Sequence, residues 1–83
     1  MKTPKRKVIK KVRFKKGTRQ KTITAVVFPV SDRGYWVGDY FQIHEGRNIV
    51  YDDWHTLERD QRKNMNKLYE LIRELQNRGW KKI

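Results

Sequence analysis

The stretch TITAVVFPV, residues 22–30, decides the fold of this chain. It is rich in β-branched residues, which is typical of a β-strand. Pro29 cannot donate a ladder hydrogen bond, so we expect it at the end of this strand or at an edge position. Polar turns flank the stretch on both sides, and strands joined by short loops pair as an antiparallel meander.

The residues before this stretch alternate from Lys7 onward, which predicts another strand. One set of alternate residues also contains Lys10, and its apolar members are expected to face the core: Val8, Val12 and Phe14. The other set also contains Ile9, and its basic members are expected to face water: Lys11, Arg13 and Lys15. The loop at residues 16–20 contains Gly17, which can adopt a positive φ and suits a hairpin.

A third strand is predicted over residues 35–44, after the turn at residues 31–34. One of its faces is expected to carry Tyr35, Val37, Phe41 and Ile43. The other is expected to carry Trp36, Tyr40, Gln42 and His44. Gly38 is a candidate bulge position, where the two faces could mix. A shorter fourth strand is expected to begin at residues 49–51.

The hydrophobic period changes in the C-terminal third, where apolar residues recur at spacings of three and four. This predicts a helix with one apolar stripe: Met65, Leu68, Leu71, Ile72 and Leu75. Either Thr56 or Asp60 could cap its start, and Gly79 is expected at its C-terminal end. The predicted fold class is α+β, an antiparallel sheet of three to four strands in meander order, packed on one C-terminal helix. Residues 1–6 are expected to be a basic flexible arm, and residues 7–83 a single small domain.

Positive charge is concentrated at the N-terminus. Eleven of the 21 Lys and Arg residues lie within residues 1–21, which contain no acid, and the whole chain has a net charge of +12. Clustered like charges destabilise a compact state, so this cluster favours a polyanionic partner. That partner would be DNA or RNA, or an acidic surface of a host protein or ribonucleoprotein. The residues predicted to contact phosphates are Lys5, Arg6, Lys7, Lys10, Lys11, Arg13, Lys15, Lys16, Arg19 and Lys21.

Two aromatic residues of the third predicted strand are candidates for base stacking. If Trp36 and Tyr40 lie on the open face of the sheet, their rings would stand beside the cations of the first strand. Rings for bases and cations for the backbone are the combination that binds single-stranded nucleic acid. The alternative is that both rings belong to the core.

The sequence offers little support for catalysis or for a cofactor. Histidines and acids gather in the second half, but their spacing matches no metal-ligand pattern: His44, Glu45, Asp52, Asp53, His55 and Glu58. We therefore expect no enzyme activity, no metal and no cofactor. The chain has no cysteine, no signal-peptide pattern and no apolar run long enough for a membrane span, so we expect a cytoplasmic protein without a membrane partner.

Residues 24–80 resemble a family of small uncharacterised proteins of phages, plasmids and conjugative elements. The resemblance rests on Val27-Phe28-Pro29, Tyr40, Ile43-His44-x-Gly46, Asp52, the leucines at 68, 71 and 75, and the terminal Gly79-Trp80. It implies a mobile-element origin, with the host cytoplasm as location, and a sheet-plus-helix fold. The basic arm lies outside it.

The function predicted from these observations is a non-enzymatic nucleic-acid-binding module. The basic arm and first strand would hold phosphates, and sheet aromatics would add base stacking. The alternative is a protein-interaction module, a small phage-type inhibitor of a host enzyme or ribonucleoprotein, of the anti-CRISPR or anti-defence type.

Overall fold

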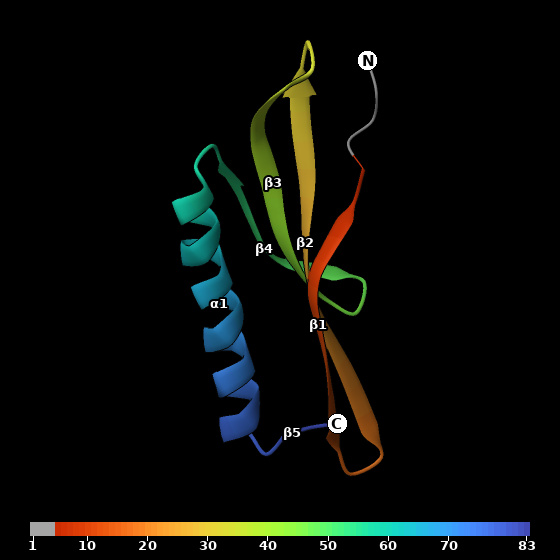
Figure 1. The fold of residues 1–83 in the computed structure, drawn as a ribbon. Helices are drawn as coiled ribbons and strands as arrows, with labels where there is room; N and C mark the ends of the chain where they lie inside the picture. The colour runs from red at the N-terminus through yellow and green to blue at the C-terminus, as the bar shows by residue number, and fades with distance from the viewer. Residues whose placement is uncertain (1–4) are drawn as a thin grey trace.

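The computed structural model of the chain describes residues 5–83 and contains one antiparallel sheet and one helix (Figure 1). The elements are β1 (Lys7–Lys16), β2 (Arg19–Asp32), β3 (Tyr35–Glu45), β4 (Asn48–His55), α1 (Glu58–Asn77) and β5 (Lys81–Lys82). The strand order is β4-β3-β2-β1-β5. The predicted α+β meander on one C-terminal helix is confirmed, and β5 is a fifth strand that the sequence did not predict. Of the predicted arm, residues 1–4 lie outside the described residues, and Lys5 and Arg6 precede β1.

Short turns join the first four strands. The β2–β3 turn places Arg33 at φ 52° and Gly34 at φ 85°. Two consecutive positive φ values match the right-handed twist of the flanking strands, which is why tight hairpins favour them. Pro29 pairs with Asp39 of β3, and β1 reaches only as far as Val27. Pro29 therefore has a neighbouring strand on one side only. This is the edge position, one of the two alternatives predicted for it.

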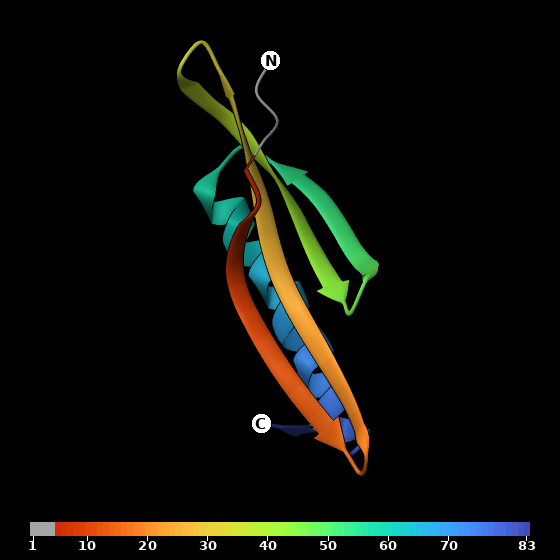
Figure 2. The same ribbon diagram turned by 90° about the vertical axis from the view of Figure 1, so that its right-hand side faces the viewer.

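The core lies between α1 and one face of the sheet. Side chains on this helix-facing side are buried: Val12, Phe14, Ile23, Ala25, Val27, Phe41, Ile43, Leu68 and Leu75. Met65, Leu71, Ile72 and Trp80 are partly buried against this cluster. The predicted helix stripe thus closes the core. We call the opposite side of the sheet the open face; Figure 2 looks onto it, with α1 behind.

A bulge in β1 overturns one predicted core position. Val8 pairs with Val26 and Lys10 pairs with Ala25, so Ile9 is the extra residue between them. Directly paired residues point to the same side of a sheet. Ala25 belongs to the core cluster, so Val26 and its partner Val8 lie on the open face, where Val8 is 51% exposed. The prediction that Val8 faces the core is wrong, and Ile9 packs against the core in its place.

Both ends of α1 differ in detail from the sequence-based expectation. Leu57 is the N-terminal cap residue and provides no side-chain hydrogen bond, so neither Thr56 nor Asp60 caps the helix. At the other end, Gly79 has a φ of 93° and Trp80 N–H donates to the carbonyl of Leu75 at 3.0 Å. This left-handed cap reverses the chain.

The reversed chain forms the last strand. β5 adds to the free edge of β1, with Lys82 opposite Phe14 and Lys81 opposite Lys15. The last residue continues the contact, because Ile83 N–H donates to the carbonyl of Arg13 at 3.0 Å. The C-terminus is thereby fixed beside the basic strand.

Candidate nucleic-acid interface

Three basic side chains of β1 lie on the open face. Lys11 pairs with Thr24, Arg13 with Thr22 and Lys15 with Gln20, whereas the residues between them, Val12 and Phe14, point into the core. The alternation in the sequence produces this separation, because successive side chains of a strand point to opposite sides. The predicted orientation of these three cations toward solvent is confirmed.

Two more cations complete what we call the basic cluster: Arg6, Lys11, Arg13, Lys15 and Lys81. Arg6, Lys11 and Arg13 line a cleft of about 400 Å³, and Ile83 also lines it. Among the side chains that the structure describes, no carboxylate forms an ion pair with any member of the cluster. These five positive charges follow the β1 side of an exposed sheet face, and such a row of charges attracts a polyanion.

The remaining predicted phosphate contacts have partners within the protein or lie elsewhere. The Lys10 ammonium lies 5.2 Å from the centre of the Tyr69 ring on α1. The Lys16 Nζ donates to the carbonyl of Arg78 at 2.6 Å, at the C-terminal end of α1.

Lys21 also has partners on the helix-facing side. It forms an ion pair with Glu45 at 2.7 Å and lies 4.7 Å from the Trp80 ring centre. Lys7 lines a different cleft, on the helix-facing side. Arg19 stands opposite Lys16 at the hairpin end. Lys5 is exposed before β1.

The predicted pairing of Trp36 with Tyr40 on one face is wrong. Gly38 pairs with Val30 and Trp36 pairs with Ser31, so Val37 is an extra residue and the faces exchange there. The bulge turns Trp36 to the helix-facing side, where its indole N–H donates to Asp39 Oδ1 at 2.8 Å. Tyr40 remains on the open face.

The ring that accompanies Tyr40 is that of Trp54. The two residues pair directly between β3 and β4, and their ring centres are 4.7 Å apart with an angle of 54°. Phe28 of β2 lies directly opposite Tyr40 on its other side, so a row of three aromatic residues crosses the open face. Tyr40 is 49% exposed and Trp54 is 41% exposed. The sequence-based prediction assigned no role to Trp54. Pairing the predicted third and fourth strands across the turn at residues 45–48 would have placed residue 54 opposite residue 40.

Glycine at position 38 makes room for this ring. A Cβ built on Gly38 would lie 2.4 Å from Cζ2 and 2.6 Å from Cη2 of Trp54. The six-membered ring of Trp54 therefore rests against bare backbone. The sheet backbone covers one side of the Trp54 ring, while part of the Trp54 side chain remains exposed to solvent.

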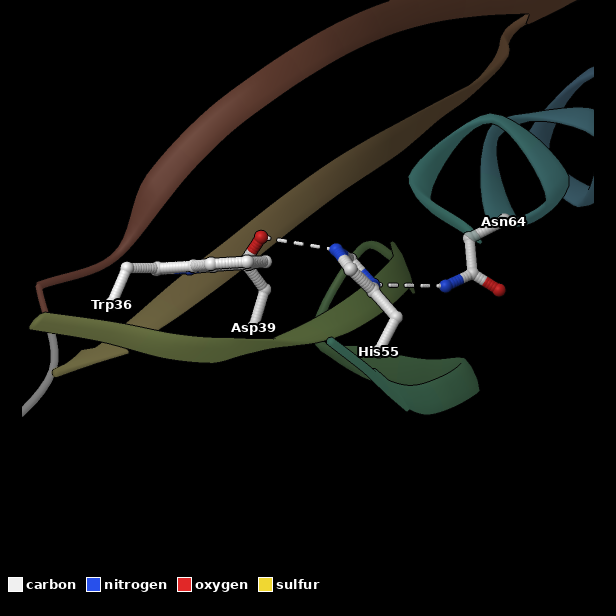
Figure 3. A network of polar contacts seen from close by, with 4 residues as sticks. All are labelled: Trp36, Asp39, His55 and Asn64. Carbon is white, nitrogen blue, oxygen red and sulfur yellow. Dashed lines mark hydrogen bonds and ion pairs between the residues drawn. The ribbon is translucent and has the colours of Figure 1, made fainter. Parts of the chain in front are cut away.

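A chain of hydrogen bonds occupies the helix-facing side near the base of the β2–β3 hairpin (Figure 3). His55 Nε2–H donates to Asp39 Oδ2 at 3.0 Å, and His55 Nδ1 accepts from Asn64 Nδ2 at 3.2 Å. Tyr51 O–H donates to Asn64 Oδ1 at 2.9 Å. His55 and Asn64 are buried, and all the donors and acceptors in this chain are compatible with a neutral histidine protonated on Nε2. The network ties β3 and β4 to α1.

Burial, and to a smaller extent the negative charge of Asp53, raise the pKa of the Tyr51 phenol. Both causes favour the neutral phenol, which is the form that donates to Asn64. The Tyr51 hydroxyl therefore keeps the proton that it donates to Asn64 until the pH approaches its raised pKa.

The histidines and acids of the second half do not form a common site. His44 lies on the open face and contacts Gln42 at 2.9 Å, whereas His55 lies on the helix-facing side. In the described part of the chain, no group of three or more such residues could hold a metal ion. Residues 5–83 also contain no helix with the length and apolar character that a membrane crossing requires.

Comparison with protein-family models, with curated proteins and with solved structures found no match for the chain. The resemblance to small phage, plasmid and conjugative-element proteins therefore stays a prediction.

Proposed function

We propose that this chain is a non-enzymatic nucleic-acid-binding module that holds phosphates on the basic cluster of its open face. The observation that carries the proposal is that Lys11, Arg13 and Lys15 share one solvent-facing side of β1 and have no acidic partner among the described residues. Cations arranged on a strand contact the phosphate backbone and carry little sequence information. Binding should therefore be salt-sensitive and largely independent of sequence.

The structure offers a charge-matched test, because adjacent lysines of β1 face opposite ways. In one variant Lys11 and Lys15 are replaced by Ala, and in the other Lys10 and Lys16 are replaced by Ala. Both lose two positive charges, so long-range attraction falls equally in the two. Only the first removes cations from the open face.

The affinity of each variant for labelled oligonucleotides is measured over a range of salt concentrations. Each phosphate contact contributes about −0.7 to the slope of log K against log salt on single strands and about −0.9 on duplex DNA. The open-face double variant should therefore lose about 1.4 to 1.8 from the slope. The helix-side double variant should keep most of the parent slope. Equal losses in the two variants would contradict a phosphate site on this face.

The second candidate function is the protein-interaction module, a phage-type inhibitor of a host enzyme or ribonucleoprotein. The observation that favours it is the projecting tip of the β2–β3 hairpin, where Tyr35 is 78% exposed and Val37 is 41% exposed. Exposed apolar side chains of this kind anchor protein interfaces. The test is inhibition of a purified host nuclease or ribonucleoprotein by the parent protein and by a Tyr35→Ser variant. Inhibition that requires Tyr35 and not Lys11 would put this candidate first.

We further propose that the protein acts in the cytoplasm. The absence of cysteine supports this location, because the cytoplasm keeps thiols reduced and disulfides are rare in its proteins.

A further inference from the structure

We infer that the ligand of the open face is a single-stranded polynucleotide, whose bases stack on Tyr40 and Trp54 while its phosphates lie on the basic cluster. This inference rests on the proposed function and specifies the class of nucleic acid. It depends on three features of the open face: a pre-positioned aromatic surface, its distance from the cations, and the position of the acidic residues.

The first feature is that Trp54 is positioned before any ligand arrives. Its ring rests against the backbone of Gly38 and lies against the ring of Tyr40 at 4.7 Å. A ring held in this way loses little conformational freedom when a base stacks on it. Large rings left partly exposed on an open sheet that also carries cations match the way proteins bind unpaired bases. In a duplex the faces of the bases are already stacked on one another, so the same rings would have no partner there.

The second feature is the distance between the rings and the cations. Lys11 pairs with Thr24 of β2, and Tyr40 pairs with Phe28 of the same strand. The distance from Thr24 to Phe28 along β2 is about 13 Å. Trp54 lies three strands away from β1, or about 14 Å across the sheet. The diagonal from Lys11 to Trp54 is thus roughly 20 Å. An extended strand of several nucleotides covers this length, within the range of known single-strand sites of about 4–16 nucleotides.

The third feature gives the ligand an orientation. Asp52 lies on the open face of β4, opposite Gln42, and is exposed. A phosphate beside Asp52 would be repelled, so at the β4 end of the ligand the base lies on Trp54 and the phosphates point back toward the β1 side. Between the two ends the open face presents the uncharged side chain of Gln42, which allows the chain to cross.

The test compares three ligands: oligo-dU, oligo-rU and a mixed-sequence DNA duplex, each about eight nucleotides or base pairs long. Trp54→Ala should weaken binding of the single strands by about 5- to 150-fold, the factor that corresponds to one stacked base. Duplex binding should not change. Trp54→Phe, which restores a ring, should recover most of the single-strand affinity. The sugar with the larger Trp54-dependent loss identifies the ligand as DNA or RNA.

Trp36→Ala is the matched control, because this tryptophan lies on the helix-facing side. It should leave the affinity of all three ligands unchanged. Since Trp54→Ala also removes packing from β4, each affinity is calculated per folded molecule, and Tyr40→Leu serves as a second variant that keeps apolar bulk. Loss of single-strand affinity in Tyr40→Leu would support the platform even if Trp54→Ala does not fold.

The failure of this inference can be distinguished from failure of the proposed function. If the open-face lysine variant weakens binding but the Trp54 and Tyr40 variants bind single strands as the parent does, the basic cluster binds nucleic acid without a stacking platform. If the parent binds none of the three ligands at moderate salt, both proposals are overturned.

Discussion

His55 Nε2 lies 3.0 Å from Asp39 Oδ2 and joins the end of β4 to the middle of β3 beneath α1. The same carboxylate accepts the indole N–H of Trp36 through its other oxygen. One acid thus satisfies a buried imidazole and fixes the orientation of a tryptophan just beyond the bulge.

Replacing Asp39 by Ala should destabilise the fold. The His55 imidazole is buried and would keep an N–H without a partner, which costs about 1–3 kcal/mol. Urea unfolding measures the change. Asp53→Ala is the control, because this acid is exposed on β4 and should change the free energy of unfolding by less than about 0.5 kcal/mol. Equal effects of the two variants would show that the network contributes nothing to stability.

The stability of the protein should decrease at alkaline pH through Tyr51. Its pKa is raised in the folded state, so the folded protein binds the phenolic proton more tightly than the unfolded chain does. The resulting stabilisation is fully present below the ordinary tyrosine pKa of 10.0 and is lost as the pH rises through the folded-state pKa. Unfolding free energies measured across this range should show the decrease in the parent, and Tyr51→Phe should reduce it. Asp53→Asn should lower the pKa of Tyr51 in a phenolate absorbance titration, because it removes the smaller of the two causes.

Leu68→Ala should leave much of the protein unfolded at moderate temperature. Leu68 is fully buried between α1 and the sheet, and truncation of such a leucine costs about 2–5 kcal/mol. A small domain has only about 5 kcal/mol in total. Ile72 is only partly buried, so Ile72→Ala should be milder, and Leu57→Ala, at an exposed position, should be nearly neutral. Thermal melts that rank these variants in another order would show that α1 packs differently.

Gly79→Ala should destabilise the C-terminal end of α1 through backbone strain alone. A Cβ there would meet the Lys16 Cε at 3.5 Å and the Lys16 Nζ at 3.8 Å, both ordinary contacts, but φ is 93°. A left-handed conformation costs an L-residue about 1–2 kcal/mol. Gly79→Asn should lose less than Gly79→Ala, because asparagine tolerates this region better. Chemical unfolding of the two variants measures the difference, and an equal loss in both would indicate a steric cause.

Hydrophobic periodicity is sufficient to predict the first three strands and the helix, because each is long. It predicts only the start of the fourth strand, at residues 49–51, whereas β4 runs from Asn48 to His55 and contains a register shift of its own. The faces of β1 and β3 were partly wrong for one physical reason. A single extra residue, Ile9 in β1 and Val37 in β3, inverts the alternation beyond it without changing the local composition. Gly38 marked the second bulge in the sequence, but only the structure shows which rings lie on each face. Trp54 was missed because its contacts to Tyr40 and Gly38 come from an adjacent strand.

The placement of charge across the sheet gives the molecule an electric dipole. One edge carries the basic cluster on β1 and β5, and the other carries Asp52 and Asp53 on β4. A dipole of this kind turns in the field of an approaching polyanion before any contact is made. The productive orientation is thereby favoured during diffusion, which raises the association rate more than it slows dissociation. Added salt should therefore lower the association rate constant more than it raises the dissociation rate constant.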